Sequence, residues 1–411
     1  MRKLSEKILL ILLLLTVITV TLLPSAFAAD ADNIITGLSE GGTKILCIAH
    51  RGDWHSFPEN SVEAINAALD CDGLSVDVKL TSDQKPVLMA DDTVNRMCIS
   101  PDGRSAFGEV SSFTLAKLKE FYLRNNNGGA DKSKTDCRVA ELKEAYMVTK
   151  GKTALFLSVS EDDFKTVYDY VKALGKLNET VFRINAKAKR IVKLTKGLEN
   201  VNVVGRYQGN IIFLATEAAR VSFKNNINTI ELGSINSYSV LFKTYMMERF
   251  NGNHRAMISM VDGLCGNRPD SESGWDDLIS RGYSVIETNF PTELREYIKE
   301  TEAAAKELEN SIDLYGKTSL ASYTTDSERD FNTALEEATV LLTKPSSLSS
   351  LQNAKSTFVT AYSALEVGAK KSVTLEFKFS FGRIVAVTTF AAAVIVGSLF
   401  LHKRRITEEE N

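Results

Sequence analysis

The sequence predicts an α/β protein whose main part is a (β/α)8 TIM barrel, and three observations support this. Over residues 44–300, short apolar runs rich in Val, Ile and Leu alternate with longer amphipathic segments, which is the pattern of parallel strands joined by helices. A stretch of about 250 residues is the usual size of such a barrel. After residue 300 the pattern changes to helices rich in Ala, Glu and Leu, which indicates a separate helical part.

Nine apolar runs are candidate strands, one more than an eight-stranded barrel needs. Catalytic side chains in this fold gather at the C-terminal ends of the strands, so the residues that follow each run are candidate functional residues. By the same rule, His254 and Arg255 precede a late strand and are expected at the opposite, stabilising end. The nine runs are Ile45–Ala49, Leu74–Leu80, Pro86–Met89, Ala154–Val159, Val181–Ile184, Val201–Gly205, Thr229–Leu232, Ala256–Met260 and Ser284–Glu287.

The composition excludes several classes of protein. Of the 411 residues, 44% are hydrophobic and 25% are charged, and the net charge is only −3. A nucleic-acid-binding protein would carry a clustered basic excess, so we predict no nucleic-acid partner. Five cysteines are too few for a disulfide-built scaffold, and no CxxC pair indicates a zinc site. The chain has only four histidines, and acid/base and metal enzymes depend on this residue.

The N-terminal segment, residues 1–28, has the layout of a secretory signal peptide. A short basic stretch precedes an apolar run, and Ala26-Phe27-Ala28 provides a small-x-small cleavage pattern. The alternative is an N-terminal membrane anchor that is not cleaved. Pro24 and the alanines that follow the apolar run favour the signal peptide.

The C-terminal segment predicts a transmembrane helix. Residues 384–401 contain no charged side chain, and Lys403-Arg404-Arg405 follow them, which is typical of a membrane span with a cytosolic tail, here residues 402–411. We therefore expect a single-pass protein of the cell membrane with its N-terminal body extracellular. Cysteines can pair in that environment, and Cys98 and Cys137 are one candidate pair.

Residues 301–366 predict a small helical bundle or stalk. Thr301–Leu314, Thr325–Leu342 and Leu348–Leu365 have apolar side chains at helical spacing. The plain interpretation is a stalk between the barrel and the membrane. The segment also resembles the FIVAR-type modules of bacterial surface proteins, through Tyr323-Thr324, Phe331, Ala334-Leu335, Ala338, Ala354, Ala361 and Leu365.

A motif suited to phosphate chemistry follows the first candidate strand. His50 and Arg51 lie in Ala49-His50-Arg51-Gly52, and Phe57-Pro58-Glu59-Asn60-Ser61 follows them. Imidazole can move a proton, and guanidinium can bind two phosphate oxygens at once. Together with Asp77-Val78-Lys79-Leu80-Thr81-Ser82-Asp83, this order of motifs resembles the glycerophosphodiester phosphodiesterase family.

The resemblance extends over residues 44–299. Pro86–Arg96, Val139–Ala145 and Gly282–Pro291 match further family segments in the same order. It implies a barrel of the phospholipase-C-like phosphodiesterase type and the hydrolysis of phosphodiesters in lipid metabolism. It also implies a Ca²⁺ or Mg²⁺ ion held by an E-x-D pair on the second strand and by the glutamate of an E-x-K on the fourth, and a second histidine as the acid for the leaving group.

The chain departs from the family at the residues that carry the chemistry. Ser75 replaces the glutamate of E-x-D, which leaves Asp77 as the one carboxylate of that pair. Ser158 and Ser160 stand where E-x-K is expected, and Ala90 replaces the second histidine. The resemblance assigns catalytic positions to His50 and Arg51, substrate binding to Arg51, Glu59 and Asn60, and a weakened metal position to Asp77.

These losses predict that hydrolysis is lost or strongly impaired. A calcium site needs six to eight oxygen ligands, so the loss of two expected carboxylates argues against retention of the metal ion. Loss of a general acid alone costs a factor of about 10² to 10⁴ in rate.

Two alternatives stay open, an active phosphodiesterase with a rearranged site and a non-catalytic binding or structural module at the cell surface. The candidate ligands are a phosphodiester-containing small molecule, a phospholipid headgroup or a teichoic-type polymer. A rearranged site would draw on Asp53, His55, Asp91, Asp92 and Glu231.

Overall fold

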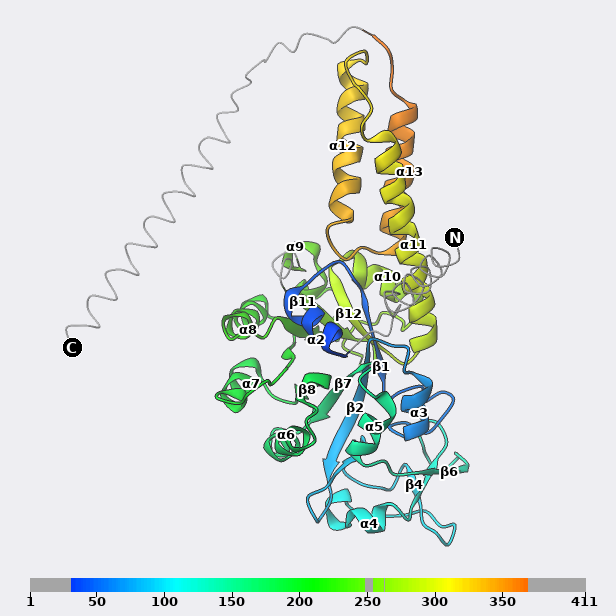
Figure 1. Cartoon of the computed structure of the whole chain (residues 1–411), viewed down its shortest axis with the longest axis vertical. Helices are drawn as coiled ribbons and strands as arrows, with labels where there is room; N and C mark the ends of the chain where they lie inside the picture. Colours follow the sequence, from blue (N-terminus) through cyan, green and yellow to red (C-terminus); the bar gives the residue numbers. More distant parts are fainter. Residues whose placement is uncertain (1–30, 248–253, 262, 369–411) are drawn as a thin grey trace, which may run out of the picture. The chain divides into compact units, whose positions relative to one another are not determined.

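The computed structural model describes residues 31–247, 254–261 and 263–368 (Figure 1). The predicted signal peptide, transmembrane helix and cytosolic tail lie outside the described residues. Within the described part of the chain, no helix combines the length and the apolar character that a membrane span needs.

Eight parallel strands follow one another around a nearly closed barrel in the order of the chain. The first and last of these strands pair with each other, as β1 with β12. Between β8 and the residues just before β9, two hydrogen bonds complete the barrel. The Phe182 amide donates to the Asn202 carbonyl at 2.8 Å, and the Val204 amide donates to the Phe182 carbonyl at 3.1 Å. The predicted (β/α)8 fold is therefore confirmed. Its strands are β1 (Leu46–His50), β2 (Gly73–Leu80), β7 (Ala154–Val159), β8 (Thr180–Ile184), β9 (Gly205–Gln208), β10 (Thr229–Gly233), β11 (Arg255–Ser259) and β12 (Tyr283–Thr288).

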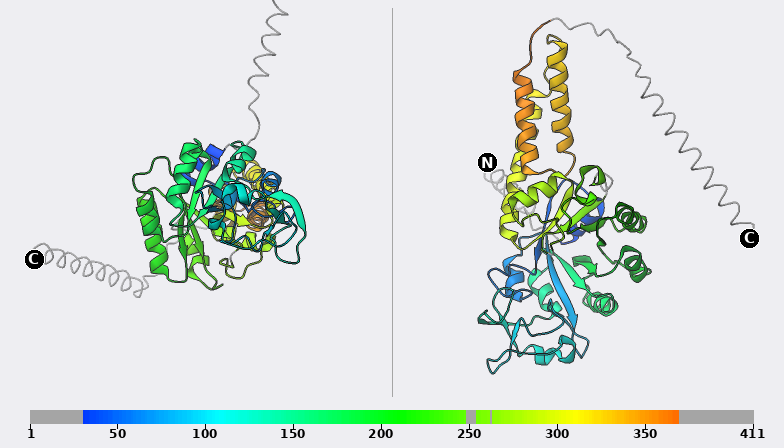
Figure 2. Two further views of the ribbon diagram at one scale, coloured as in Figure 1. Left: turned by 90° about the horizontal axis from the view of Figure 1, so that it is seen from below. Right: turned by 180° about the vertical axis from the view of Figure 1, so that it is seen from behind.

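Helices connect the strands on the outside of the sheet, and Figures 1 and 2 show α6, α7 and α8 side by side there. Local signals begin several of them. Ser61, for example, caps α3 by accepting a hydrogen bond from the Ala64 amide at 3.0 Å. The connecting elements are α3 (Val62–Ala67), α5 (Leu142–Thr149), α6 (Phe164–Ala173), η2 (Leu177–Glu179), α7 (Ala188–Thr195), α8 (Ile212–Lys224), η3 (Val240–Phe242), α9 (Thr244–Met247) and α10 (Glu272–Ser280).

The ninth candidate strand is not part of the barrel. Residues Pro86–Leu88 form β3, which pairs antiparallel with the end of β2 through Val78↔Leu88 and Leu80↔Pro86. A tight turn reverses the chain between them, and Gln84 has a positive φ of 56° in it. The candidate Val201–Gly205 is displaced, because β9 begins at Gly205.

An insertion between β3 and α5 has an apolar core of its own, which includes Val94, Met97 and Leu123. It consists of the antiparallel strands β4 (Cys98–Ile99), β5 (Tyr122–Arg124) and β6 (Lys134–Arg138), with η1 (Val110–Ser112) and α4 (Leu115–Leu118). The candidate pair Cys98 and Cys137 is not joined, because all five cysteine thiols are free.

A helix that precedes the predicted barrel closes the end where the strands begin. Helix α2 (Ala31–Glu40) buries Ile34, Ile35 and Leu38 in one apolar cluster with Leu46 of β1 and with side chains of other strands. Arg255, at the start of β11, anchors the chain that follows α2. Its guanidinium donates to the carbonyls of Gly37 at 2.6 Å and of Gly41 and Lys44 at 2.7 Å. Arg255 therefore lies at the stabilising end, as predicted.

Three helices follow the last strand. Helix α11 (Pro291–Tyr315) is continuous, so the predicted boundary between residues 300 and 301 falls inside it. Helices α12 (Thr325–Leu341) and α13 (Leu348–Ser363) begin at the residues that the sequence predicts. Figures 1 and 2 show α11 and α13 side by side, and Phe331 packs on Phe358 with ring centroids 5.5 Å apart. The likeness to FIVAR-type modules stays a prediction.

Candidate functional site

The His-Arg-Gly turn places two functional side chains at the end of β1. Arg51 and Gly52 both have positive φ, 59° and 77°. A side chain at Gly52 would collide with the Ala64 backbone, because its Cβ would lie 2.5 Å from the carbonyl carbon, so only glycine fits there. The Arg51 amide donates to the Ser75 carbonyl at 2.7 Å and the Asn60 amide donates to the Arg51 carbonyl at 3.1 Å. The turn is thereby fixed to β2 and to the following loop.

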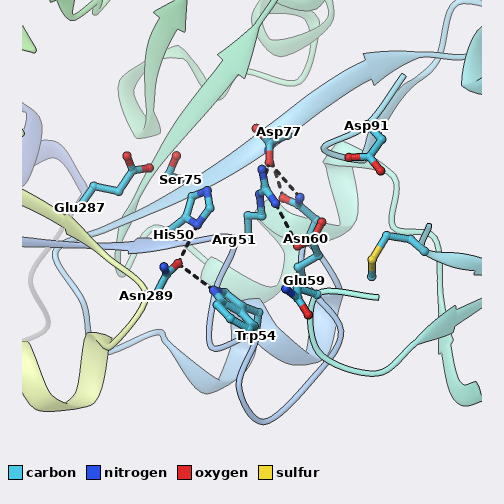
Figure 3. Close-up of polar contacts among 12 residues, drawn as sticks. His50, Arg51, Trp54, Glu59, Asn60, Ser75, Asp77, Asp91, Glu287 and Asn289 are labelled. Atoms are coloured by element: carbon cyan, nitrogen blue, oxygen red, sulfur yellow. Dashed lines mark hydrogen bonds and ion pairs between the residues drawn. The ribbon is translucent and has the colours of Figure 1, made fainter. Parts of the chain in front are cut away.

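Arg51 is held by two carboxylates, as Figure 3 shows. Its Nε donates to Asp77 Oδ2 at 2.7 Å, and its Nη1 donates to Glu59 Oε2 at 2.9 Å. Asn60 Nδ2 donates to the same Asp77 oxygen at 3.1 Å. Burial lowers the pKa of the Arg51 guanidinium, but the charges of Asp77 and Glu59 outweigh burial and raise it. This arrangement fixes the direction in which the guanidinium faces.

A second arginine completes the network behind Arg51. Arg96 Nη2 donates to Glu59 Oε1 at 2.6 Å and to Asp91 Oδ1 at 2.8 Å. Both oxygens of the buried Glu59 therefore bind arginines, which braces the loop after β1 against the segment after β3. The sequence-predicted residues Glu59 and Asn60 both lie beside Arg51. Neither lines the cavity at the C-terminal ends of the barrel strands, an end that we call the barrel mouth.

His50 has a defined proton position. Its Nδ1 lies 2.9 Å from Asn289 Oδ1, and Trp54 Nε1 donates to that same atom at 2.9 Å (Figure 3). The indole N–H is a donor only, so the shared Asn289 atom is an oxygen and accepts from both groups. A neutral His50 therefore carries its proton on Nδ1 and keeps the Nε2 lone pair available to accept a proton.

An arginine lies inside the barrel where the resemblance places a metal ion. Arg183 of β8 donates from Nη1 to Ser75 Oγ at 2.8 Å and to Glu287 Oε1 at 2.6 Å, and from Nη2 to Glu231 Oε2 at 3.0 Å. The side chains of Arg183, Glu231 and Glu287 are 10%, 4% and 1% exposed. Burial by itself raises the pKa of Glu287, but the charges of Arg183 and His50 outweigh it and lower this pKa to about 2.

The residues present do not fit a divalent cation. Asp77 of β2 is the strand partner of Ser158 in β7, and Ser158 is the strand partner of Arg183 in β8. At this level of the barrel, neighbouring strands therefore carry a carboxylate, a hydroxyl and a guanidinium. Ser75 accepts from Arg183, so a guanidinium already occupies the position beside its hydroxyl oxygen. Among the residues that the structure describes, no group of three or more His, Cys, Asp or Glu is placed to hold a metal ion.

A cavity of about 230 Å³ opens at the C-terminal ends of the strands. Four of its lining side chains, Arg51, Lys79, Arg183 and Arg206, are cationic, and two, Asp77 and Glu287, are carboxylates. Each of these cations also has a carboxylate partner, so an anion such as a phosphate ester would be bound by N–H donors at fixed positions and not by an excess of positive charge. Three predicted site residues also line the cavity, namely His50, Ala90 and Ser158.

The side chains proposed for a rearranged site do not converge. Asp91 and Asp92 are paired with Arg96 and Lys79. His55 is exposed and stacks between Trp54 and Phe290, with ring centroids 3.9 and 4.7 Å away. Glu231 alone enters the barrel interior, where it pairs with Arg183, and Asp53 does not line the cavity.

The buried ion cluster is not among the sequence predictions, although the sequence carries a signal for it. Arg183, Glu231 and Glu287 are single charged residues inside otherwise apolar strands. A charge buried in a strand needs an opposite charge as its partner, and a barrel brings the interior side chains of different strands together. Three such strands in one chain therefore predict an internal cluster of ion pairs.

Comparisons with known proteins agree with this architecture. Residues 50–270 match the model of the glycerophosphoryl diester phosphodiesterase family. A glycerophosphodiester phosphodiesterase of Caldanaerobacter subterraneus is 40% identical over 79 residues, which cover 19% of this chain and 30% of that protein. Glycerophosphodiester phosphodiesterase 1 of Mus musculus is 35% identical over 104 residues, 25% of this chain and 29% of that protein. The matched segment thus spans about three tenths of either relative.

Solved structures share the fold. A glycerophosphoryl diester phosphodiesterase from Parabacteroides distasonis superposes with a TM-score of 0.51 at 20% identity, over 66% of this chain and 92% of that one. At this identity the similarity concerns the fold alone. Because the family model matches more than half of the sequence, the chain belongs to the glycerophosphoryl diester phosphodiesterase family.

Proposed function

We propose that the barrel mouth binds the phosphoryl group of a phosphodiester without a metal ion, and that the family's hydrolysis is lost or strongly impaired. The observation that carries this proposal is the position of Arg183. Its guanidinium donates to Ser75, and its backbone pairs with Ser158 on the neighbouring strand. Ser75 and Ser158 occupy the positions where the family resemblance expects metal-binding glutamates. A fixed organic cation then supplies positive charge where the family uses a metal ion.

The fixed charge is suited to binding more than to catalysis. Arg183 is neutralised by Glu231 and Glu287, so its own field on a phosphate is weaker than that of a divalent ion. Arg51, Lys79 and Arg206 add cationic groups around the cavity, and guanidinium groups match pairs of phosphate oxygens. The cavity therefore offers several N–H donors that could bind the oxygens of an ester phosphate.

The acid and base of the reaction are incomplete. The contact of His50 Nδ1 with Asn289 supports a role for His50 Nε2 as the base that activates a nucleophile. Ala90 also lines the cavity and has no group that could protonate the leaving alkoxide. Loss of a general acid costs a rate factor of about 10² to 10⁴, and loss of metal stabilisation adds to that cost.

The cellular setting is part of the proposal. The apolar segments at residues 1–28 and 384–401 support a protein anchored in the cell membrane with its barrel outside. A phospholipid headgroup, a teichoic-type polymer and a soluble phosphodiester are all accessible there. Trypsin added to intact cells should release barrel fragments, and their protection until lysis would contradict the proposed orientation.

One experiment on the purified full-length chain tests the function. Glycerophosphocholine and bis(4-nitrophenyl) phosphate are assayed with Ca²⁺, Mg²⁺ or EDTA, and glycerol 3-phosphate binding is measured by calorimetry. We expect no turnover, and binding that EDTA leaves unchanged. Arg206→Met should weaken binding at least fivefold, whereas the surface control Arg220→Met should not.

Two results would overturn the proposal. Turnover that His50→Ala abolishes would show an active phosphodiesterase with a rearranged site. Absence of binding, with both arginine variants like the natural protein, would favour a purely structural barrel. A Ser75→Glu, Ala90→His, Ser158→Glu variant is a useful reference, because it restores three of the four expected family residues while Ser160 and Arg183 remain.

A further inference from the structure

A second cavity lies beside the barrel mouth, between the start of α7 and the first turns of α8. Its volume is about 630 Å³. One wall is an apolar stripe along α8, formed by Leu214, Ala218 and Val221 at positions i, i+4 and i+7, with Ile211 just before the helix. Ala188 of α7 lies across from them. We call this cavity the α7–α8 groove.

The apolar wall is open to solvent. Ile211 and Leu214 are 57% and 46% exposed, although both line a concave surface where large side chains are expected to find a partner. Sites that bind small molecules are mostly apolar with a few polar groups at fixed positions. The groove therefore has the surface of a binding site for an apolar group.

The groove is continuous with the phosphate cavity. Asn185 and Arg206 line both, and Arg206 Nη1 donates to Asn185 Oδ1 at 3.0 Å. Arg206 also lies 3.6 Å from Glu231 of the buried ion cluster. A single ligand can thus place an anionic group among the arginines and an apolar group against α8, with Arg206 at the junction.

We propose that the ligand is a lipid phosphodiester, whose phosphate binds in the barrel mouth and whose acyl chain lies in the α7–α8 groove. This inference rests on the proposed phosphate binding and names its ligand class. The polar edge of the groove carries Lys187 together with the ion pair of Lys189 and Glu217, whose Nζ and Oε1 are 3.2 Å apart, so the apolar wall of α8 is the part of the groove suited to an acyl chain. A teichoic-type polymer or a soluble phosphodiester has no apolar chain to cover Leu214.

Photo-crosslinking tests the proposal on the full-length chain in lipid nanodiscs. The probe is a lysophosphatidylglycerol with a diazirine in its acyl chain, and labelled peptides are identified by mass spectrometry. We expect labelling of the peptide that contains residues 210–221, and at least threefold less of it with excess glycerophosphoglycerol, which occupies only the phosphate cavity.

Two neighbouring residues provide a matched pair of variants. Leu214→Glu puts a charge on the groove wall, whereas Phe213→Glu makes the same kind of change at a side chain that is 73% exposed and does not line the groove. Leu214→Glu should reduce labelling of residues 210–221 at least fivefold, and Phe213→Glu should leave it within twofold. Calorimetry with glycerophosphoglycerol should give the same affinity for both variants, which shows that the mouth is intact.

The outcomes separate this inference from the proposed function. If glycerophosphoglycerol binds but does not compete, or if both variants reduce labelling equally, the groove is only an apolar surface and the lipid proposal is wrong. Labelling confined to other peptides has the same meaning. If glycerophosphoglycerol does not bind the natural protein at all, the proposed phosphate binding fails first.

Discussion

Two buried arginines, one at each end of the barrel, are stabilised in opposite ways. Arg183 at the mouth binds the carboxylates of Glu231 and Glu287. Arg255 at the closed end donates to the backbone carbonyls of Gly37, Gly41 and Lys44. Burial lowers the pKa of Arg255 to about 10, with Asp72 opposing it. Burial also acts on Arg183, but its two glutamates outweigh it and raise its pKa.

The contrast shows what each arginine contributes. Carbonyl dipoles satisfy the N–H groups of Arg255 without compensating its charge in full, so this charge costs free energy and the residue acts as an anchor for α2. At the mouth, two carboxylates compensate the charge of Arg183 in the barrel interior.

The largest expected effect is the loss of Arg183. Arg183→Met leaves Glu231 and Glu287 buried without their main counter-charge, which should lower the free energy of unfolding by about 3–5 kcal/mol. Urea denaturation followed by circular dichroism measures the change. Adding Glu231→Gln and Glu287→Gln to the variant should recover most of the loss. A destabilisation below about 1 kcal/mol would show that the cluster is hydrated and contributes little.

Low pH should have the second largest effect, because it protonates Glu287 at the barrel mouth and so lowers the free energy of unfolding. The pKa of Glu287 is lowered from 4.5 to about 2 in the folded chain, so its contribution is complete above pH 4.5 and disappears as the pH falls towards 2. At about 1.4 kcal/mol for each pKa unit, this amounts to roughly 3 kcal/mol. Thermal unfolding from pH 6 to pH 2.5 should show this loss, and the Glu287→Gln variant should lose correspondingly less. Parallel curves for the two proteins would contradict the assignment.

Loss of the anchor at the closed end should have a smaller effect. Arg255→Met leaves three backbone carbonyls without their donor, at about 1–3 kcal/mol for each buried unsatisfied group, but it also removes a charge that burial disfavours. We expect a net loss of about 2 kcal/mol and faster hydrogen exchange in residues 31–40, measured by mass spectrometry. Unchanged exchange in α2 would show that the apolar cluster alone holds this helix.

Added calcium should have the smallest effect. In the natural chain, 5 mM Ca²⁺ should shift the thermal midpoint by less than about 1 °C, because a ligand that does not bind the folded state does not stabilise it. The Ser75→Glu, Ser158→Glu variant should also respond little, since Arg183 would pair with the new carboxylates. A saturable shift of several degrees in the natural chain would show a metal site and reverse the interpretation of Arg183.

The sequence was most informative where a signal is local. The apolar runs predicted the barrel strands, the His50-Arg51-Gly52 motif located the end of β1, and α12 and α13 begin at Thr325 and Leu348 as predicted. Helix α2 was missed, since ten residues with four buried side chains give a weak pattern next to a long apolar segment. The run Pro86–Met89 predicts one more barrel strand, although the structure forms a hairpin strand there, because strand propensity does not distinguish a barrel strand from a hairpin.

The sequence by itself determined that this is a barrel of the phosphodiesterase family in which Ser75, Ala90 and Ser158 replace the expected metal and acid residues. Tertiary structure alone decided which side chain lies beside Ser75. Arg183 is 108 residues from Ser75 and 104 from Glu287, and only closure of the barrel brings these side chains into contact. The α7–α8 groove likewise exists only where two helices pack beside the mouth, because a cavity is a property of packing and not of any one segment.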